Sequence, residues 1–276
     1  MKKISRRSFL AAAAVSVAAV ALTACGGSAS SAASSSAASS EAASSSAAAE
    51  LTTVESGKLT MATNATFPPY EMTTDAGTIE GIDIDTAQAI ADKLGLELQV
   101  DNMEFDSSLL SVQQGKADIV MAGVTVTPER QNVMDFSDSY ATGIQSVIVT
   151  NDSEIATLEN LSGHLIGTQR GTTGYLYCTD DFGEDSVIAY DSGLTAVQAL
   201  NNGQVDCVVI DDAPAQAYVA ANPGLKVLDT SYAVEEYAIG IAKGNTALLD
   251  AVNAALAELA EEGTLQAIVD KYITAE

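Results

Sequence analysis

Gly115-Lys116-Ala117-Asp118-Ile119-Val120-Met121-Ala122 is echoed by Gly203-Gln204-Val205-Asp206-Cys207-Val208-Val209-Ile210, and these two turn segments together decide the fold class. Each follows a predicted helix, over residues 107–114 and 192–201, and each passes through an aspartate into an uninterrupted apolar run. Apolar runs of this kind fit parallel strands that are covered on both faces. The two segments therefore predict two similar lobes, each built around its own sheet. The alternative is a chance similarity of two helix-to-strand turns.

Strand-like and helix-like stretches alternate from Lys58 onward. Residues 59–63 predict a strand. Residues 85–94 predict an amphipathic helix that ends at Gly95, because apolar side chains recur at steps of three and four residues and glycine is a common C-cap. Residues 96–100 predict the next strand. This alternation indicates an α/β fold in which each lobe is a mixed, mainly parallel sheet flanked by helices.

Two further strands are predicted over residues 143–150 and 237–242, where apolar stretches lead into loops. We interpret them as two crossover strands that join the lobes, after which helices over residues 248–261 and 264–273 return to the first lobe. The predicted first lobe comprises residues 57–143 and 240–276, and the predicted second lobe comprises residues 144–239, with hinge strands at its edges.

The beginning of the chain has the features of a bacterial export signal. Basic residues at positions 2, 3, 6 and 7 precede an apolar run over residues 9–22. That run is shorter than the about 20 residues of a membrane span, and it ends in Leu22-Thr23-Ala24-Cys25, which resembles a lipobox. We therefore predict a signal peptide over residues 1–24 and a mature N-terminus at Cys25 that carries the lipid.

Two alternatives remain open in this region. Cleavage at an ordinary Ala-x-Ala-type site would leave Cys25 as an incidental thiol. The stretch Ser5-Arg6-Arg7-Ser8-Phe9-Leu10 also resembles a twin-arginine export motif, for which a chance basic segment is the alternative.

Residues 25–56 are predicted to tether the acylated cysteine to the folded part. Ser28–Glu50 consists almost only of serine and alanine, a composition that cannot bury enough apolar surface to fold. No later apolar run is long enough to cross a membrane, so we expect no fused channel or sensor kinase. The lipid anchor on the extracytoplasmic face of the cell membrane is the predicted membrane contact.

The charge balance narrows the class of partners. Acidic residues outnumber basic ones by 37 to 12, for a net charge of −25. Nucleic acid and anionic lipid headgroups are therefore poor partners, and we expect a monomer. We expect no cofactor, metal site or catalytic set, because the sole histidine, His164, lies at the start of a predicted strand without a matching triad or zinc pattern.

Two cysteines remain in the folded part. Cys178 and Cys207 could form a disulfide in a compartment outside the cytoplasm. Each also stands where a small buried apolar residue would suit, and the sequence leaves both interpretations open.

The loop over residues 123–130 contains a conflict that a ligand would resolve. Thr127 is a good N-cap and Pro128 suits the first helical position, which puts Arg130 in the first turn, where the helix dipole disfavours a cation. A bound carboxylate would remove the conflict, gripped by Arg130 with the Thr125 hydroxyl nearby. The alternative is a surface arginine paired with a neighbouring acidic residue.

Three more loops follow predicted strands, at the edge where sheets of this type bind ligands. The glycine-rich turn over residues 169–174 offers free amide N–H groups to an anion, although such turns are often only turns. Asp211-Asp212 can accept from an ammonium group. We favour Asp212 for the cleft and helix capping for the other aspartate.

The loop over residues 64–70 is stiffened by two prolines and carries Phe67, an aromatic residue that turn chemistry does not require. Together with Phe105 it could form apolar walls around a ligand side chain, and core packing of both rings is the alternative. An anion clamp, a cation acceptor and aromatic walls together favour a zwitterionic amino acid as the ligand.

The chain from about Lys58 to Tyr272 resembles the family 3 extracellular solute-binding proteins, the polar amino-acid-binding components of bacterial ABC importers. The motifs that carry the resemblance are Asn64-Ala-Thr-Phe-Pro-Pro-Tyr-Glu71, Gly81-Ile-Asp-Ile-Asp85, Gly115-Lys-Ala-Asp118, Thr125-Val-Thr-Pro-Glu-Arg130, Asp135-Phe-Ser-Asp138 and Gly171-Thr-Thr-Gly174. The resemblance implies a two-lobed, periplasmic-binding-protein-like fold of type 2 that closes like a hinge on its ligand. It also implies permease subunits as partners.

The resemblance further implies a role for each matching residue. Arg130 matches the arginine that holds the α-carboxylate, Thr125 and Thr173 match its hydrogen-bonding partners, and Asp212 matches the acceptor of the α-ammonium. The implied ligand-binding set is Asn64, Phe67, Phe105, Gly123, Thr125, Arg130, Gln169, Thr172, Thr173 and Asp212.

The position of Asn64 leaves the ligand side chain open. Some relatives have an aspartate there, and its loss removes one partner for a lysine- or arginine-type side chain. Glu71 or Glu104 could supply the charge instead. We therefore expect a polar or basic L-amino acid rather than an acidic one. The competing hypotheses are an exported dehydratase-like enzyme on the same scaffold and an adaptor that presents the ligand to a sensor.

Overall fold

The computed structural model describes residues 51–273, and they form an α/β protein with two lobes. In the first lobe β1 (Lys58–Thr63) is the central strand, with β5 (Glu97–Asn102) and β6 (Ile119–Val120) parallel to it on either side. Helices α1 (Ile82–Leu94) and α2 (Phe105–Gln113) connect these strands. The predicted glycine C-cap is confirmed, because Gly95 follows α1 in the left-handed conformation, with φ 69°.

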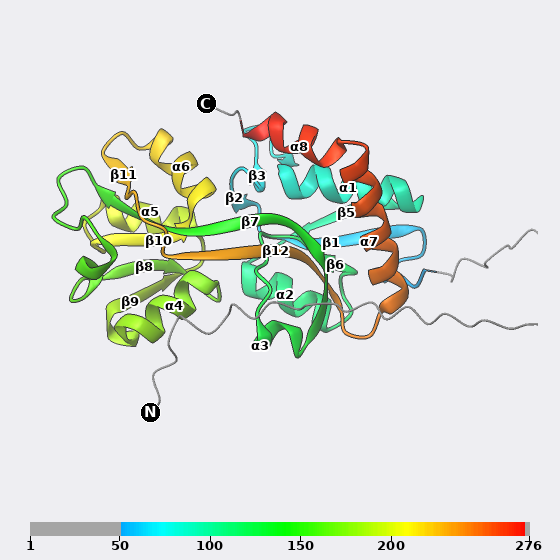
Figure 1. Cartoon of the computed structure of the whole chain (residues 1–276), viewed down its shortest axis with the longest axis horizontal. Coiled ribbons are helices and arrows are strands. Elements are labelled where there is room, and N and C mark those ends of the chain that lie inside the picture. Colours follow the sequence, from blue (N-terminus) through cyan, green and yellow to red (C-terminus); the bar gives the residue numbers. More distant parts are fainter. Residues whose placement is uncertain (1–50, 274–276) are drawn as a thin grey trace, which may run out of the picture. The chain divides into compact units, whose positions relative to one another are not determined.

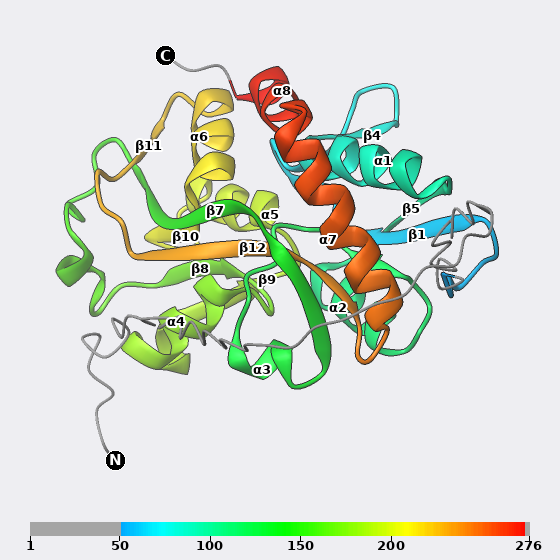
Figure 2. The same ribbon diagram turned by 45° about the vertical axis from the view of Figure 1, so that its right-hand side comes forward.

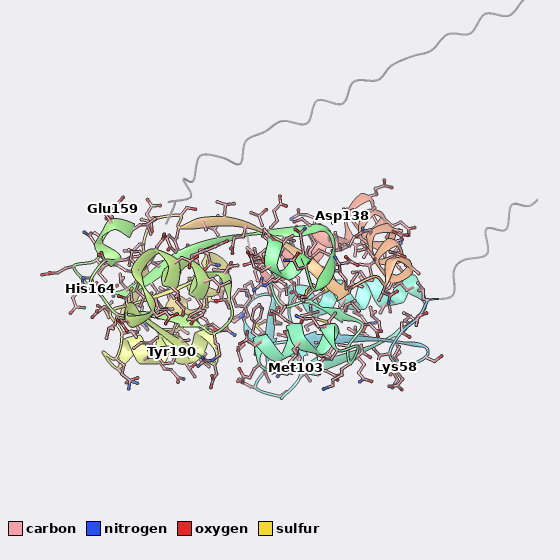
Figure 3. All side chains as sticks on the ribbon, turned by 90° about the horizontal axis from the view of Figure 1, so that it is seen from below. Lys58, Met103, Asp138, Glu159, His164 and Tyr190 are labelled. Atoms are coloured by element: carbon pink, nitrogen blue, oxygen red, sulfur yellow. The ribbon has the colours of Figure 1, made fainter. Side chains whose placement is uncertain are left out.

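The second lobe repeats the arrangement with β8 (Ile166–Gln169), β9 (Val187–Tyr190) and β10 (Cys207–Asp211), which are parallel. Its helices are α4 (Thr173–Phe182), α5 (Gly193–Asn201) and α6 (Asp212–Ala221). Figure 3 shows the two lobes from below, with Lys58, Met103 and Asp138 in one and Glu159, His164 and Tyr190 in the other.

Two long antiparallel strands run through both lobes. They are β7 (Met134–Thr150) and β12 (Ala233–Ala242), drawn in green and orange in Figure 1. They pair with β6 at one end and with β10 at the other, so the strand order β5-β1-β6-β12-β7-β10-β8-β9 is unbroken. Each lobe has its own mainly parallel strands, as expected, and the crossover strands join the two sets into one continuous sheet, with β11 (Leu225–Val227) paired to β7.

The two C-terminal helices return to the first lobe. Helices α7 (Thr246–Glu261) and α8 (Thr264–Tyr272) both pack against α1, as Figure 2 shows. The remaining elements are a small antiparallel sheet, β2 (Thr66–Phe67), β3 (Glu71–Thr73) and β4 (Ile79–Glu80), the short helix α3 (Pro128–Gln131), and the 3-10 turns Leu158–Leu161 and Glu184–Ser186. None of the helices within residues 51–273 is long and apolar enough to cross a membrane.

The two turn segments have the same backbone geometry. Gly115 and Gly203 both adopt a left-handed φ, 65° and 67°, which favours glycine over other residues. In each turn the carboxylate of the following aspartate accepts a backbone hydrogen bond from a neighbouring segment. Asp118 accepts from the N–H of Thr60 in β1 at 2.7 Å, and Asp206 accepts from the N–H of Leu165, just before β8, at 2.8 Å. The two turns therefore resemble each other in structure as well as in sequence.

The second lobe has its own hydrophobic core, and both remaining cysteines lie in it. Cys178 on α4 and Cys207 on β10 are fully buried and free. Of the two interpretations left open by the sequence, the structure supports the one in which each thiol fills a small apolar position.

Residues 1–50, which contain the predicted signal peptide, Cys25 and most of the predicted tether, lie outside the described residues.

Candidate functional site

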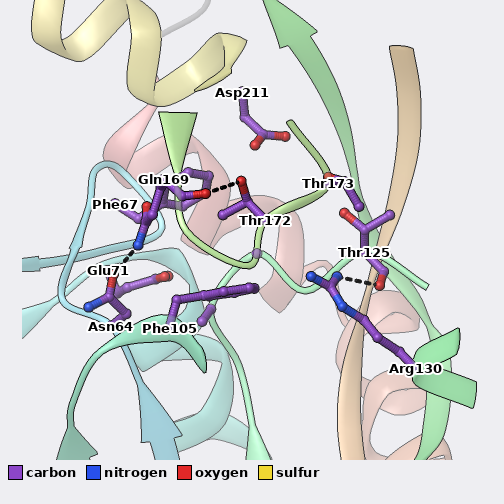
Figure 4. A pocket seen from close by; sticks show the side chains of 12 residues that line it. Asn64, Phe67, Glu71, Phe105, Thr125, Arg130, Gln169, Thr172, Thr173 and Asp211 are labelled. Atoms are coloured by element: carbon purple, nitrogen blue, oxygen red, sulfur yellow. Dashed lines mark hydrogen bonds between the residues drawn. The ribbon is translucent and has the colours of Figure 1, made fainter. Parts of the chain in front are cut away.

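A pocket lies between the two lobes, at the carboxyl ends of the strands (Figure 4). It contains about 330 Å³ of space that protein atoms do not fill, part of which is open to solvent. It is lined by Asn64, Phe67, Glu71, Phe105, Ala122, Gly123, Thr125, Arg130, Gln169, Thr172, Thr173 and Asp211. Every residue of the predicted ligand-binding set is therefore present in the lining except Asp212.

The structure places Asp211 in the pocket instead of Asp212. Asp211 ends β10, is 8% exposed, and accepts from Gln145 Nε2 at 2.8 Å and from the hydroxyl of Tyr237. Asp212 begins α6 and points to an outer groove, where it accepts from Ser146 Oγ at 3.2 Å. The sequence favoured Asp212 for the cleft, and the structure brings Asp211 into the pocket lining instead, because consecutive residues at a strand end face opposite sides of the sheet. Asp211 also borders the outer groove.

Arg130 is held in the pocket by its short helix. Thr127 caps α3, and its Oγ accepts from Arg130 N–H at 3.2 Å. The guanidinium is 8% exposed and lies over the Phe105 ring, 5.3 Å from the ring centroid. It donates only to backbone carbonyls, those of Thr125 at 2.8 Å and Gly171 at 3.1 Å. The alternative of a surface arginine is therefore excluded.

Glu235 is not a lining residue, but it is the main charged group that contacts the lining and that the sequence interpretation missed. Its side chain is 5% exposed, and its Oε2 accepts from Thr125 Oγ1 at 3.2 Å, Thr173 Oγ1 at 2.9 Å and Gln145 Nε2 at 3.0 Å. Its Oε1 is buried without a hydrogen-bond partner. The strand predicted over residues 237–242 begins two residues after Glu235, whereas β12 begins at Ala233, so the sequence interpretation left Glu235 outside the strand.

Asn64, Glu71 and Gln169 are drawn on the other side of the pocket from Arg130 in Figure 4. Gln169 Nε2 donates to Asn64 Oδ1 at 2.9 Å, and Asn64 Nδ2 donates to the Met103 carbonyl at 2.8 Å. Glu71 is fully buried, and among the described residues its carboxyl group has no hydrogen-bond partner other than the neighbouring carboxyl group of Asp83. Of the two acidic residues considered for this end, Glu71 lines the pocket, whereas Glu104 is exposed and does not.

Phe67 and Phe105 are both buried and both line the pocket, at 7% and 6% exposure. Gly123 lies so close to the Phe67 ring that a Cβ there would come within 2.7 Å of it, and its φ is 55°. Its N–H donates to Asp83 Oδ2 at 3.0 Å, which fixes the loop. Thr172 caps α4 by accepting from Tyr175 N–H at 3.3 Å.

Contacts across the pocket show that the lobes are closed on each other. Asn64 and Arg130 of the first lobe bond to Gln169 and Gly171 of the second. Gly171 has a φ of 75° and lies against Asp106 so closely that a Cβ would overlap its carboxylate. A side chain at this position would force the exposed Asp106 side chain to move and would strain the backbone at this φ.

Buried carboxyl groups outnumber cations around the pocket. Glu71, Asp83, Asp211 and Glu235 are each at most 8% exposed, and Arg130 is the only cation among the lining residues. Burial raises the pKa of Asp211 to about 7 and that of Asp83 to about 6, and it raises the pKa of Glu71 well above its usual value, with the nearby Asp83 adding to the effect. Burial also lowers the pKa of Arg130, and Glu235 opposes that shift.

The chain was compared with known proteins. Residues 59–275 match the bacterial extracellular solute-binding proteins, family 3. ABC transporter arginine-binding protein 1 of Escherichia coli K12 is 34% identical over 78% of this chain and 90% of its own length. L-cystine-binding protein TcyJ of the same organism is 32% identical over 80% of this chain and 85% of its own.

Solved structures agree with this match. An ancestral arginine-binding protein bound to arginine is 41% identical, with a TM-score of 0.74 over 79% of this chain and 98% of that one. The fold is therefore the α/β type 2 fold of periplasmic binding proteins. By its sequence, and with a fold to match, the chain belongs to the bacterial extracellular solute-binding proteins of family 3, a family of binding proteins rather than enzymes.

Proposed function

We propose that this protein captures a basic L-amino acid, with arginine as the first candidate, and delivers it to an ABC importer. The observation that carries this proposal is Glu71, a fully buried carboxyl group of the pocket lining whose partner among the described residues is another acid, Asp83, and not a cation. A buried carboxyl group is stable as an anion only when it is paired. A guanidinium or ammonium group at the end of a ligand side chain would provide the missing donors.

The charges of the pocket favour the same class of ligand. Four buried carboxyl groups surround a pocket with one lining cation. A basic amino acid brings two positive charges and one negative charge, so it reduces the imbalance, whereas an acidic amino acid would increase it. The arginine-binding proteins among the relatives support this choice.

The α-amino and α-carboxylate groups have separate partners in the proposed complex. Arg130 has N–H groups left to bind the α-carboxylate bidentately, next to the N-terminus of α4. Asp211 accepts from the α-ammonium. Phe67 and Phe105 enclose the aliphatic part of the side chain.

A neutral amide ligand such as glutamine is the second candidate. Asn64 and Gln169 hydrogen-bond to each other at 2.9 Å across the pocket, and both side chains can donate and accept. A terminal amide could replace this bond with two of its own. The two candidates differ in whether the ligand requires Glu71.

The proposal includes the setting of the protein. Its signal peptide is removed, Cys25 carries the lipid that holds it at the extracytoplasmic face of the membrane, and permease subunits receive the ligand. Residues 57–143 with 240–276 and residues 144–239 are the two lobes that close by bending β7 and β12. Metabolic labelling with a palmitate analogue tests the anchor: Cys25→Ala should abolish the label.

The decisive experiment is isothermal titration and thermal denaturation of the chain from residue 26 onward against arginine, lysine, histidine, glutamine, cystine and glutamate. A ligand at a hundred times its dissociation constant should stabilise the folded state by ~2.7 kcal/mol, which raises the melting temperature by roughly 5 to 10 °C. We expect arginine or lysine to give the largest shift. Glutamate as the tightest ligand, or no shift with any amino acid, would contradict the proposal.

A further inference from the structure

Glu235 occupies the place in the hydrogen-bond network that the ligand carboxylate needs. The hydroxyls of Thr125 and Thr173, which match carboxylate-binding positions of the family, both donate to Glu235 Oε2, at 3.2 and 2.9 Å. Gln145 Nε2 donates to the same oxygen at 3.0 Å. A side-chain carboxylate behind the pocket lining therefore already engages the hydroxyls that a ligand carboxylate is expected to use.

The competition is direct because each hydroxyl has a single proton to donate. While Thr125 and Thr173 donate to Glu235, they cannot donate to a ligand. The incoming carboxylate is then limited to Arg130 and to backbone N–H groups. If the hydroxyls instead donate to the ligand, Glu235 keeps only Gln145 of these three donors. Because Glu235 is 5% exposed, water cannot replace the lost hydrogen bonds. Either arrangement weakens the binding of the carboxylate.

Electrostatics act in the same direction. Among the acidic groups near Arg130, Glu235 has the strongest effect in raising the pKa of the guanidinium. The pocket lining contains no second cation. In the complex two carboxylates, that of Glu235 and that of the ligand, would thus share one buried guanidinium, and like charges placed together oppose binding.

We propose that Glu235 is an internal competitor for the α-carboxylate of the ligand and lowers the affinity of the site for free amino acids. This inference rests on the proposed function. Glu235 also joins Thr125 of the first lobe, Thr173 of the second and Gln145 of a crossover strand, so it supports the closed form in the absence of ligand. An amino acid that enters must replace this support as well as bind.

The test compares Glu235→Gln with the wild-type protein, using L-arginine and L-argininamide in isothermal titration. The amide retains both cationic groups and lacks the carboxylate charge. Removal of the competing charge should tighten arginine binding about tenfold and leave argininamide unchanged or weaker. Glu236→Gln is the matched control, because Glu236 is the exposed neighbour on the same strand and loses the same charge. It should change neither affinity by more than about twofold.

Thr173→Val gives a second test, and its first half, in the wild-type protein, does not need the Glu235 variant to fold. If the hydroxyl serves Glu235 rather than the ligand, its removal should change arginine affinity less than about threefold in the wild-type protein. In the Glu235→Gln background, where the hydroxyl is free for the ligand, the same change should cost about tenfold.

Several outcomes would overturn the inference. They are a weaker binding of arginine by Glu235→Gln, an equal change for arginine and argininamide, and a loss of about tenfold for Thr173→Val alone. If another amino acid proves to be the ligand, the proposed specificity fails, and the same comparison with that amino acid and its amide still decides the role of Glu235. If no amino acid binds the wild-type protein, both proposals fail.

Discussion

The two ends of the pocket differ in how well their polar groups are satisfied. At the carboxylate end, one oxygen of Glu235 accepts from three side-chain donors, and the guanidinium of Arg130 donates to two carbonyls. At the side-chain end, Glu71 is buried and its carboxyl group is paired with another acid, Asp83. At the first end the donors that a ligand carboxylate would use are already engaged, although Glu235 Oε1 accepts no hydrogen bond, so binding there is an exchange of partners. The second end lacks a cationic donor, so there the ligand adds bonds that the protein does not have.

This difference separates two properties of the site. We expect exchange at the carboxylate end to serve any L-amino acid and to contribute little to the choice among them. Unmet acceptors at the side-chain end distinguish one amino acid from another, because a ligand without the matching donor leaves a buried group unpaired. The following predictions test this division.

The largest effect is expected from Arg130→Ala. It removes the only lining cation at the carboxylate end and leaves the buried carboxyl groups without a counter-charge. Loss of one partner from a buried charge pair costs about 3–4 kcal/mol, so affinity should fall about 100- to 1,000-fold in isothermal titration. The loss should be the same for arginine, lysine and glutamine.

Arg170→Ala is the control for Arg130. The Arg170 side chain is 56% exposed and forms a long ion pair with Asp191, at 3.8 Å. Its removal changes the net charge of the protein by the same amount as the removal of Arg130. Affinity should stay within about twofold. If Arg130→Ala weakened only basic ligands, the assignment of the carboxylate end would be wrong.

A smaller but selective effect is expected from Glu71→Gln. The substitution retains size and removes the acceptor charge for a cationic side chain, so arginine affinity should fall about 30- to 100-fold, which corresponds to about 2–3 kcal/mol. Glutamine affinity should change less than about threefold. Competition titrations with both ligands on one preparation would measure the ratio.

Glu104→Gln is the matched control, because Glu104 is exposed and does not line the pocket. It should leave both affinities unchanged. An equal loss of arginine and glutamine binding in Glu71→Gln would show that Glu71 maintains the fold rather than selects the ligand.

The smallest effect concerns pH and should have opposite signs with and without ligand. Burial raises the pKa of Asp211 from 3.8 to about 7, so the ligand-free folded protein holds this proton more tightly than the unfolded chain does. The contribution of Asp211 to stability is therefore fully present below pH 3.8 and is lost as pH rises through about 7. Thermal denaturation of the ligand-free protein should show this loss.

Ligand binding reverses the trend. The α-ammonium favours ionised Asp211, so binding releases a proton, and arginine affinity should fall about 20-fold between about pH 7.5 and 5.5. Titrations in buffers of different ionisation enthalpy would count the released protons. Asp211→Asn should reduce that count, and a tighter binding at acid pH would contradict the assignment of Asp211 to the ammonium.

The elements of the fold could be predicted where local signals were strong. The alternation of strands and helices, the glycine turns at residues 115 and 203, and the cap at Thr127 depend on short-range chemistry. Arg130 could be placed in the site for the same reason, because its conflict with the helix dipole is a local fact. The small sheet of β2, β3 and β4 was not predicted, since strands of two or three residues have too little periodicity to detect.

The rest of the site depends on contacts between distant segments. Whether Asp211 or Asp212 reaches the pocket depends on which face of β10 meets it. A shift of one residue along the strand would exchange the two aspartates. Glu235 becomes part of the site only because β12 passes beside Gln145 of β7 and under the loop that carries Thr125. Those pairings join residues far apart in the chain, and no local pattern encodes them.

The two free thiols of the second lobe offer a direct assay of unfolding. A thiol reacts as its thiolate, and burial raises the pKa of Cys178 to about 12 and that of Cys207 further still. In the chain from residue 26 onward these are the only cysteines. A maleimide dye added to the intact protein should therefore label it only as fast as the second lobe opens, so each added ligand can be ranked by how far it slows the labelling.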